Sequence, residues 1–131
     1  MTRINLIPVQ ELTNKQLIAE KHEITRVFAL AKNSKSPKIP NTYRMGTGHV
    51  TFFYDKLAFV VKRYENLCDE IRKRGFVCNQ IPSKDLLVDM PNKFINDYSP
   101  TVIDIEISRN RILERLKWAN IMTNVLHLNK C

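Results

Sequence analysis

The stretch that decides the fold is TNKQLIAEKHEITRVFALAKN, residues 13–33. It opens on Thr13 and carries Gln16 three residues later, which is the spacing of a capping box at the start of a helix. The apolar residues that follow recur near the helical period, at Leu17, Ile24, Val27, Phe28 and Leu30. Together these signals predict an amphipathic helix that ends near Asn33.

Two later stretches have the same helical periodicity. The first starts near Thr51 and ends before Gly75, a residue type that commonly follows the last helical turn. The second opens at Ser99 and Pro100, which suit the cap and the first position of a helix. Its apolar side is predicted to consist of Ile103, Ile107, Ile112 and Leu116. The tail after about residue 122 has no clear pattern.

The remaining segments contain the residues that interrupt helices. Pro8 argues against a helix through residues 1–12, so we expect an extended N-terminal arm that packs Ile4, Leu6 and Val9 onto the body. Prolines and glycines predict irregular connections at 33–48 and 76–98. No stretch alternates as a strand does. The sequence therefore predicts one compact all-α domain over residues 1–131, with three main helices and long irregular connections.

The net charge limits the kinds of partner that this protein is expected to bind. Lys and Arg number 21 against 13 Asp and Glu, a formal net charge of +8. Such a domain favours an anionic partner, either nucleic acid or a membrane surface. No stretch approaches the roughly 20 apolar residues that a membrane-spanning helix needs. The three cysteines have no zinc or redox spacing, so we expect reduced thiols in a cytosolic protein, with Cys68 inert in the core.

Motifs for phosphate loops, zinc sites, nucleophile elbows and paired-carboxylate metal sites are missing, so no metal or other cofactor is expected. The N-terminus offers one alternative chemistry. Methionine followed by a small residue is normally removed, which would leave Thr2 first with an α-amine pKa of about 7.7–8.0. Such an amine is partly neutral at pH 7 and suits Schiff-base formation at a sugar carbon. Most trimmed N-termini have no catalytic role, so this residue alone leaves both interpretations open.

Glu23 is the second candidate, with His22 beside it and Arg26 one helical turn on. A carboxylate among cations can stabilise an oxocarbenium ion or accept a proton from a deoxyribose. The alternative is a solvated helix face with an ion pair worth a few tenths of a kcal/mol. Elsewhere, His49 is expected to form structural hydrogen bonds, and Trp118 to pack rather than stack on bases.

Six blocks of the sequence resemble the phage pyrimidine-dimer DNA glycosylase and abasic-site (AP) lyase family of the endonuclease V type. They are MTRINL at 1–6, EITRVF at 23–28, GTGHVTFFYDKL at 46–57, KRGF at 73–76, DY at 97–98 and ISRNR at 107–111. The similarity runs in order from residue 1 to about residue 116. It implies a single all-α domain that excises UV-damaged pyrimidines and then nicks the strand.

The resemblance also implies roles for individual residues. The amine that attacks the sugar C1′ falls on Thr2 and the catalytic glutamate on Glu23, with β-elimination on the 3′ side and no cofactor. Residues matching the family's DNA contacts are Arg3, Arg26, Arg111 and Arg115. His22 stands where the family has an arginine, so a phosphate contact there is expected to be weaker or pH-dependent.

The implied partner is double-stranded DNA with UV photoproducts or abasic sites, bound by a monomer in a bacterial or phage-infected cytosol, with no membrane involved. The chain departs from the family in a shorter 33–48 loop and in a tail that lacks the family's aromatic segment. Two alternatives remain: a non-catalytic DNA-binding module of the same fold, and a lyase that prefers another base lesion.

Overall fold

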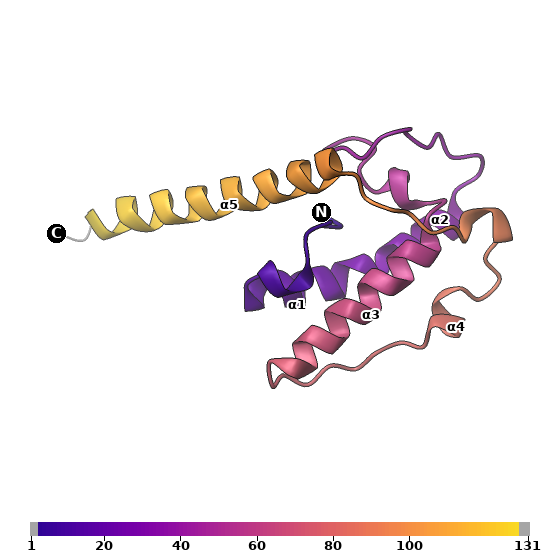
Figure 1. Cartoon of the computed structure of the whole chain (residues 1–131), viewed down its shortest axis with the longest axis horizontal. Coiled ribbons are helices and arrows are strands. Elements are labelled where there is room, and N and C mark those ends of the chain that lie inside the picture. The colour runs from indigo at the N-terminus through magenta and orange to yellow at the C-terminus, as the bar shows by residue number, and fades with distance from the viewer. Residues whose placement is uncertain (1–2, 129–131) are drawn as a thin grey trace.

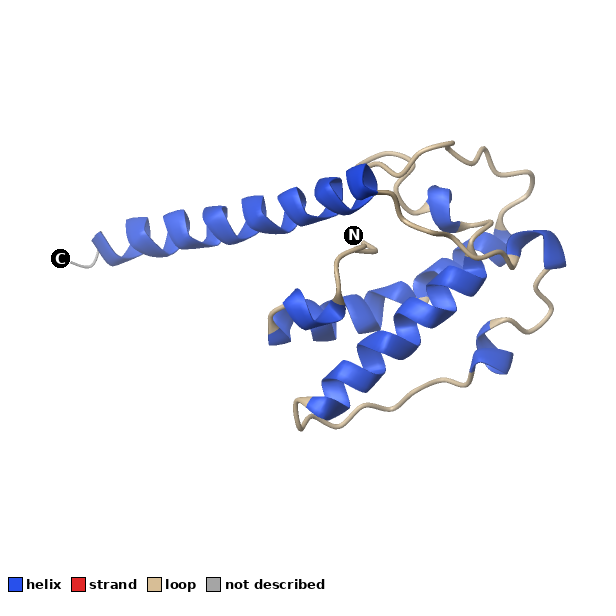
Figure 2. Ribbon diagram, viewed as in Figure 1, coloured by secondary structure: helices blue, strands red, loops and turns tan. Residues whose placement is uncertain are grey.

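The computed structural model describes the backbone of residues 3–128 and side chains as far as Met122. The helices are α1 (Asn14–Ile24), α2 (Arg26–Asn33), α3 (Leu57–Lys73), α4 (Ser83–Leu86) and α5 (Val102–Leu128). Single 3₁₀ turns occur at Val9–Glu11, Thr51–Phe53 and Asn92–Phe94. No strand occurs between residues 3 and 128, which confirms the all-α prediction (Figure 2).

The first predicted helix begins as expected but is divided in two. The Thr13 hydroxyl accepts from the Gln16 amide at 3.2 Å and the Thr13 amide donates to Gln16 Oε1 at 2.9 Å, so the capping box is present. Thr25 separates α1 from α2, and its hydroxyl donates to the His22 carbonyl at 3.3 Å, a contact that bends helices. Leu30 is 45% exposed, so its predicted place on the apolar face is wrong.

The second predicted helix is α3, which packs against α1 to form the centre of the core. It begins at Leu57 rather than Thr51, because a 3₁₀ turn occupies Thr51–Phe53. Its end matches the prediction. Gly75 has a φ of +91°, and the Gly75 and Phe76 amides donate to the Arg72 and Ile71 carbonyls at 2.9 and 3.1 Å. This pattern closes a helix in a Schellman motif.

The third predicted helix differs most from expectation. α5 begins at Val102 because Thr101, not Ser99, caps it: the Thr101 hydroxyl accepts from the Asp104 amide at 3.1 Å. The helix continues to Leu128, through the stretch after residue 122 where the sequence has no clear pattern. Figure 1 shows α5 leaving the body and extending well beyond α1.

The predicted apolar side of α5 is also wrong in part. Ile103 is 70% exposed and Leu116 is 38% exposed, whereas Ser108 and Ile112 are buried. Among the described side chains of α5, as far as Met122, those buried against the core lie in its first half. None of the helices within residues 3–128 is long and apolar enough to cross a membrane.

The N-terminal segment, residues 3–12, lies beside α1, α3 and α5 (Figure 1). Residues 3–8 belong to neither helix nor strand, and a 3₁₀ turn follows. Ile4, Leu6 and Val9 are buried, as predicted. A buried segment without regular secondary structure must satisfy its backbone polar groups through side chains, and those contacts define the candidate site.

Candidate active site

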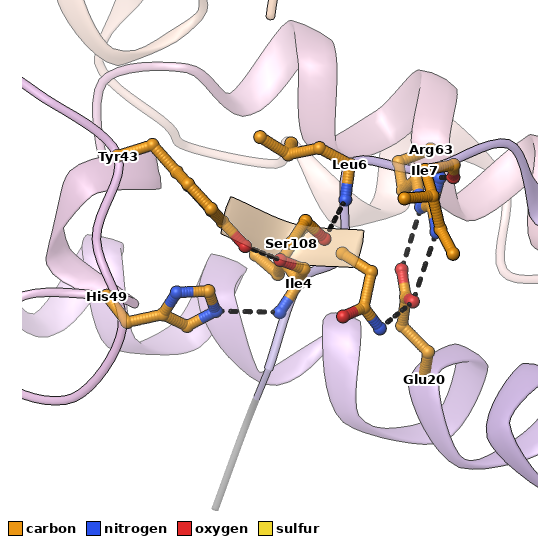
Figure 3. A network of polar contacts seen from close by, with 9 residues as sticks. Ile4, Leu6, Ile7, Glu20, Tyr43, His49, Arg63 and Ser108 are labelled. Carbon is orange, nitrogen blue, oxygen red and sulfur yellow. Dashed lines mark hydrogen bonds and ion pairs between the residues drawn. The ribbon is translucent and has the colours of Figure 1, made fainter. Parts of the chain in front are cut away.

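The first backbone groups to be anchored are those of Ile4. Its amide donates to His49 Nε2 at 2.9 Å, and its carbonyl accepts from the Tyr43 hydroxyl at 3.1 Å (Figure 3). His49 Nδ1 donates to the Arg44 carbonyl at 2.8 Å, which assigns the proton to Nδ1 and leaves Nε2 as an acceptor. The prediction that His49 is a structural hydrogen-bonding residue is confirmed.

The loop before His49 places its imidazole. Gly48 has a φ of +89°, and a Cβ at this position would lie 3.1 Å from Pro40 Cγ, so the turn requires glycine. The imidazole then packs edge-on against Tyr43 and Phe53, with ring centroids 5.4 and 5.8 Å away. Burial lowers the pKa of His49 and so favours the neutral imidazole that can accept from Ile4.

A buried ion pair holds the next part of the segment. Arg63 Nε on α3 donates to Glu20 Oε2 on α1 at 2.7 Å, and the two side chains are only 8% and 2% exposed. Glu20 Oε1 also accepts from the Asn5 side-chain amide at 2.6 Å. Arg63 Nη1 donates to the Ile7 carbonyl, as Figure 3 shows. Charge-assisted contacts of this kind tie the segment to both helices of the core.

Two further contacts complete the anchoring. The Leu6 amide donates to Ser108 Oγ on α5 at 2.9 Å. Near the other end, Arg74 donates to the carbonyls of Leu12 at 2.8 Å and of Val9 at 3.3 Å. The N-terminal segment is thus held from the loop, α1, α3 and α5, although it forms almost no regular structure.

Sequence reasoning missed Asn5, Glu20, Arg63 and Ser108. A signal for Glu20 was present, since it lies three residues after Leu17 and four before Ile24, on the apolar stripe of α1. A charged residue at such a position is seldom buried without a partner. Arg63 has the same character on α3, but nothing local indicates that the two pair across 43 residues of sequence.

A small pocket lies where the N-terminal segment, α1 and α5 meet. Its volume is about 130 Å³. The lining residues are Arg3, Asn5, Gln16, Ala19, Glu20, Glu23, Ile112 and Arg115. The structure therefore brings together three of the predicted site residues, Arg3, Glu23 and Arg115. Among the described side chains Glu23 forms no ion pair, so the pair with Arg26 that the alternative interpretation of Glu23 invoked is not seen.

Positive charge converges on this pocket. Burial and the charges of Arg115 and Arg111 lower the pKa of Arg3, while Glu23 acts in the opposite direction. Arg111 Nε is buried and has no hydrogen-bond partner among the described residues. Neighbouring guanidinium groups repel one another, and an anion placed between them relieves that repulsion. The arrangement suits a phosphate group next to the Glu23 carboxylate.

The other predicted residues lie outside the pocket. His22 and Arg26 are exposed on α1 and α2 and do not line it. Trp118, expected to pack in the core or at the surface, is 64% exposed and so does not lie in the core. Cys68 is fully buried, as predicted, and burial raises the pKa of its thiol to about 11. Thr2 lies outside the described residues.

A larger groove of about 1090 Å³ runs along the N-terminal segment and α3, and its lining includes none of the predicted site residues. Two ion pairs lie within its lining, Lys62 Nζ with Asp97 Oδ2 at 2.7 Å and Arg72 Nη1 with Asp69 Oδ1 at 3.5 Å. Within the described residues, no group of three or more side chains is arranged to hold a metal ion. The smaller pocket is therefore the better candidate for chemistry.

One comparison with known proteins bears on this pocket. The family model described as pyrimidine dimer DNA glycosylase matches residues 1–82. The match spans the N-terminal segment and α1 to α3, with Arg3, Glu23, His49 and the Glu20–Arg63 pair. It ends before α5, so Arg111 and Arg115 lie beyond it.

Proposed function

Because the chain belongs to the pyrimidine dimer DNA glycosylase family, we propose that it excises UV-damaged pyrimidines and then cleaves the strand as an abasic-site lyase. The observation that carries this proposal is the small pocket, where Glu23 and Arg115 meet Arg3. Arg3 is the residue after Thr2, so a carboxylate and phosphate-binding groups lie beside the N-terminus. DNA is the substrate that the family implies.

The nucleophile of the proposed reaction is the α-amine of Thr2, exposed by removal of Met1. Its pKa of about 7.7–8.0 leaves part of it neutral at pH 7. Two residues of chain span at most about 7 Å, which limits the distance of this amine from the Ile4 nitrogen. That nitrogen donates to His49 at 2.9 Å, and Arg3, the residue between Thr2 and Ile4, lines the pocket. Both observations support the proposal that the amine acts beside Glu23.

The chemistry proceeds in two stages. The amine forms a bond to C1′ of the damaged nucleotide while the C1′–N bond breaks, and the base leaves with the bonding electrons and takes up a proton. Loss of a proton from nitrogen and protonation of O4′ open the sugar and give an imine. Glu23 then accepts a proton from C2′, the C3′–O bond breaks, and the strand is cut on the 3′ side. Water hydrolyses the imine and frees the amine.

DNA binding is assigned to the cations around the pocket. Arg3 and Arg115 line it, Arg111 lies close enough to Arg3 to lower the pKa of that guanidinium, and His22 and Arg26 are exposed on α1 and α2. Contacts to phosphates position an enzyme without reading sequence. Selection of damage then follows from deformability, because a crosslinked and poorly stacked lesion is easier to kink and open than normal duplex.

Salt dependence tests this surface. If Arg3, Arg26, Arg111 and Arg115 each contact a phosphate, log K falls with log salt at a slope of about −3 to −4. A flat dependence would contradict the assignment.

Strand cleavage tests the reaction. Three proteins are compared: the chain with a free Thr2, the same chain with one extra N-terminal residue, and Glu23→Gln. A fourth, Glu65→Gln, removes an exposed carboxylate on α3 as a control. We expect cleavage of dimer-containing and abasic duplexes by the first protein and by the control. The extension abolishes it, and Glu23→Gln slows it by about 10²- to 10⁴-fold.

The remaining outcomes distinguish the alternatives. Cleavage of abasic duplex without cleavage of dimer-containing duplex identifies a lyase whose preferred lesion is another base. DNA binding without cleavage of either substrate identifies a non-catalytic binding module.

A further inference from the structure

The contacts at Ile4 are the anchors nearest the N-terminus among those that the structure describes. Both reach the backbone, one through the amide and one through the carbonyl, from two residues of the same loop. We propose that His49 and Tyr43 are positioning residues that hold the N-terminal amine in register with Glu23. This inference rests on the proposed function, and it adds residues that do not touch the reacting atoms.

The chemistry of His49 supports more than a packing role. It lies in an aromatic cluster with Tyr43, Phe52 and Phe53, where a phenylalanine would fill the same space. What only the imidazole supplies is a donor and an acceptor at fixed separation. Nδ1 donates to the Arg44 carbonyl, and Nε2 accepts from the Ile4 amide. That amide is buried and forms no other described hydrogen bond.

The distance from this anchor to the nucleophile makes it sensitive. Only Thr2 and Arg3 separate the proposed amine from Ile4, so a shift of Ile4 passes almost directly to the amine. The other contacts act further along the chain, through the Asn5 side chain and through the backbone from Leu6 onward. Misplacement of a reacting group by about 1 Å can slow a reaction by about 100-fold. Loss of the hydrogen bond between His49 and the Ile4 amide should therefore lower the rate of the chemical step more than the affinity for DNA.

Protonation of His49 provides a second signature. It turns Nε2 into a donor that faces the Ile4 amide, so the anchor is lost. The groups that act on the imidazole are the Arg44 carbonyl, Arg3 on the N-terminal segment and Glu20 on α1. Burial lowers the pKa of His49, and the charge of Arg3 acts in the same direction. The anchor is therefore lost at a lower pH than that at which an ordinary histidine takes up its proton.

Four variants separate positioning from stability. His49→Leu removes the acceptor, His49→Gln offers the Oε1 oxygen in its place, and Tyr43→Phe removes only the hydroxyl. Arg74→Met is the matched control, because Arg74 holds the same segment at Val9, Gln10 and Leu12, far from the amine. Folding of each variant is followed by circular dichroism.

Two quantities are measured for each protein. The single-turnover cleavage rate is measured on an abasic duplex with enzyme in excess. Kd is measured on a duplex that carries a tetrahydrofuran abasic analogue. We expect His49→Leu to lower the rate by about 100-fold, with Kd unchanged within about twofold. His49→Gln restores most of the rate. Tyr43→Phe lowers it by about fivefold, the equivalent of one hydrogen bond, and Arg74→Met lowers stability but not the rate.

The pH profile supplies a readout that a purely structural role does not move. Between roughly pH 5 and 7, protonation of the amine gives the log rate a slope of one. In the wild type a second proton, on His49, steepens that slope, whereas in His49→Gln it stays at one. This comparison and Tyr43→Phe decide the question if His49→Leu does not fold.

Three outcomes overturn the inference. The first is a folded His49→Leu that cleaves at the wild-type rate. The second is an equal loss of rate in His49→Leu, His49→Gln and Arg74→Met, which would mark a general effect of stability. The third is an unchanged Tyr43→Phe rate together with identical pH profiles. Borohydride trapping of the wild type separates this from the proposed function: without an adduct both fail, whereas with an adduct at Thr2 these three outcomes reject only the positioning role.

Discussion

The N-terminal segment and the outer half of α5 differ in a way that runs against ordinary expectation. Residues 3–12 form only one 3₁₀ turn, yet their backbone is held from the loop, α3 and α5, and the Asn5 side chain is held from α1. Residues 113–128 are regular helix, yet exposed apolar side chains follow one another along it. These are Leu113, Leu116, Trp118, Ile121 and Met122.

The difference shows that regular secondary structure and fixed position are separate properties. Helical hydrogen bonds determine the shape of α5, but only contacts with other elements determine where it lies. The N-terminal segment has few local hydrogen bonds, and buried side chains determine its position. Under the proposed mechanism this is the useful arrangement, because the reacting group is at the chain end that the anchors hold.

The largest expected effect comes from breaking the strongest anchor of the segment. Arg63→Met leaves the Glu20 carboxylate buried without its partner, so we expect a loss of about 3–5 kcal/mol in the free energy of unfolding, measured with urea. The control is Arg109→Met, which removes the exposed ion pair with Glu11 and is expected to cost far less, because an exposed pair is screened by solvent. Equal losses in the two variants would show that the buried pair does not hold the segment.

A smaller effect is expected at the other end of the segment. Arg74 is partly buried and donates to three backbone carbonyls and to Glu70. Arg74→Met should lower the free energy of unfolding by about 1–3 kcal/mol. Hydrogen exchange then gives the location of the loss. We expect faster exchange at residues 9–13 and no change at Ile4, and equal acceleration at both places would mean that the anchors do not act separately.

A pH-dependent effect is expected at Ile4. Burial lowers the pKa of His49 in the folded protein, so the unfolded chain binds a proton first as the pH falls. The stabilisation from neutral His49 is complete above about pH 6.5 and is lost as the pH falls through the folded-state value. The stability difference between wild type and His49→Gln should therefore shift in favour of the variant in acid. A constant difference from pH 5 to 8 would contradict it.

The smallest effect is expected on the outer half of α5. Trp118→Ala and Leu113→Ala should change the free energy of unfolding by no more than about 0.5 kcal/mol, because both side chains are exposed. Ile112→Ala, one residue earlier on the buried face, is the matched control and costs about 2 kcal/mol or more. A loss at Trp118 as large as at Ile112 would show that the outer half packs on the body.

The sequence correctly predicted those helix ends that depend on residues a few positions apart. The capping box at Thr13 and the glycine at 75 fixed helix ends correctly, because both act within a few residues. The start of α5 was misplaced because Thr101 and Asp104 form their own cap after Pro100. Its apolar side was misjudged because periodicity cannot show that the helix leaves the body after Ile112.

The sequence predicted the charged residues that line the candidate site, but not most of the residues that hold the N-terminal segment in place. Arg3, Glu23 and Arg115, all predicted, line one pocket. The residues that hold the N-terminal segment were missed, apart from the structural role of His49. The contacts of Asn5 with Glu20, of Glu20 with Arg63 and of Leu6 with Ser108 join residues 15, 43 and 102 positions apart. Such pairs depend on the tertiary fold and have no signature in a local window.

Borohydride trapping tests the central claim, that the anchored N-terminus is the nucleophile. Protein whose first residue is verified as Thr2 by mass spectrometry is mixed with abasic duplex DNA and reduced, and the crosslinked peptide is sequenced. The account predicts a covalent adduct on the Thr2 α-amine and none from protein with one extra N-terminal residue. An adduct on a lysine, or no adduct from protein with a free Thr2, would contradict it.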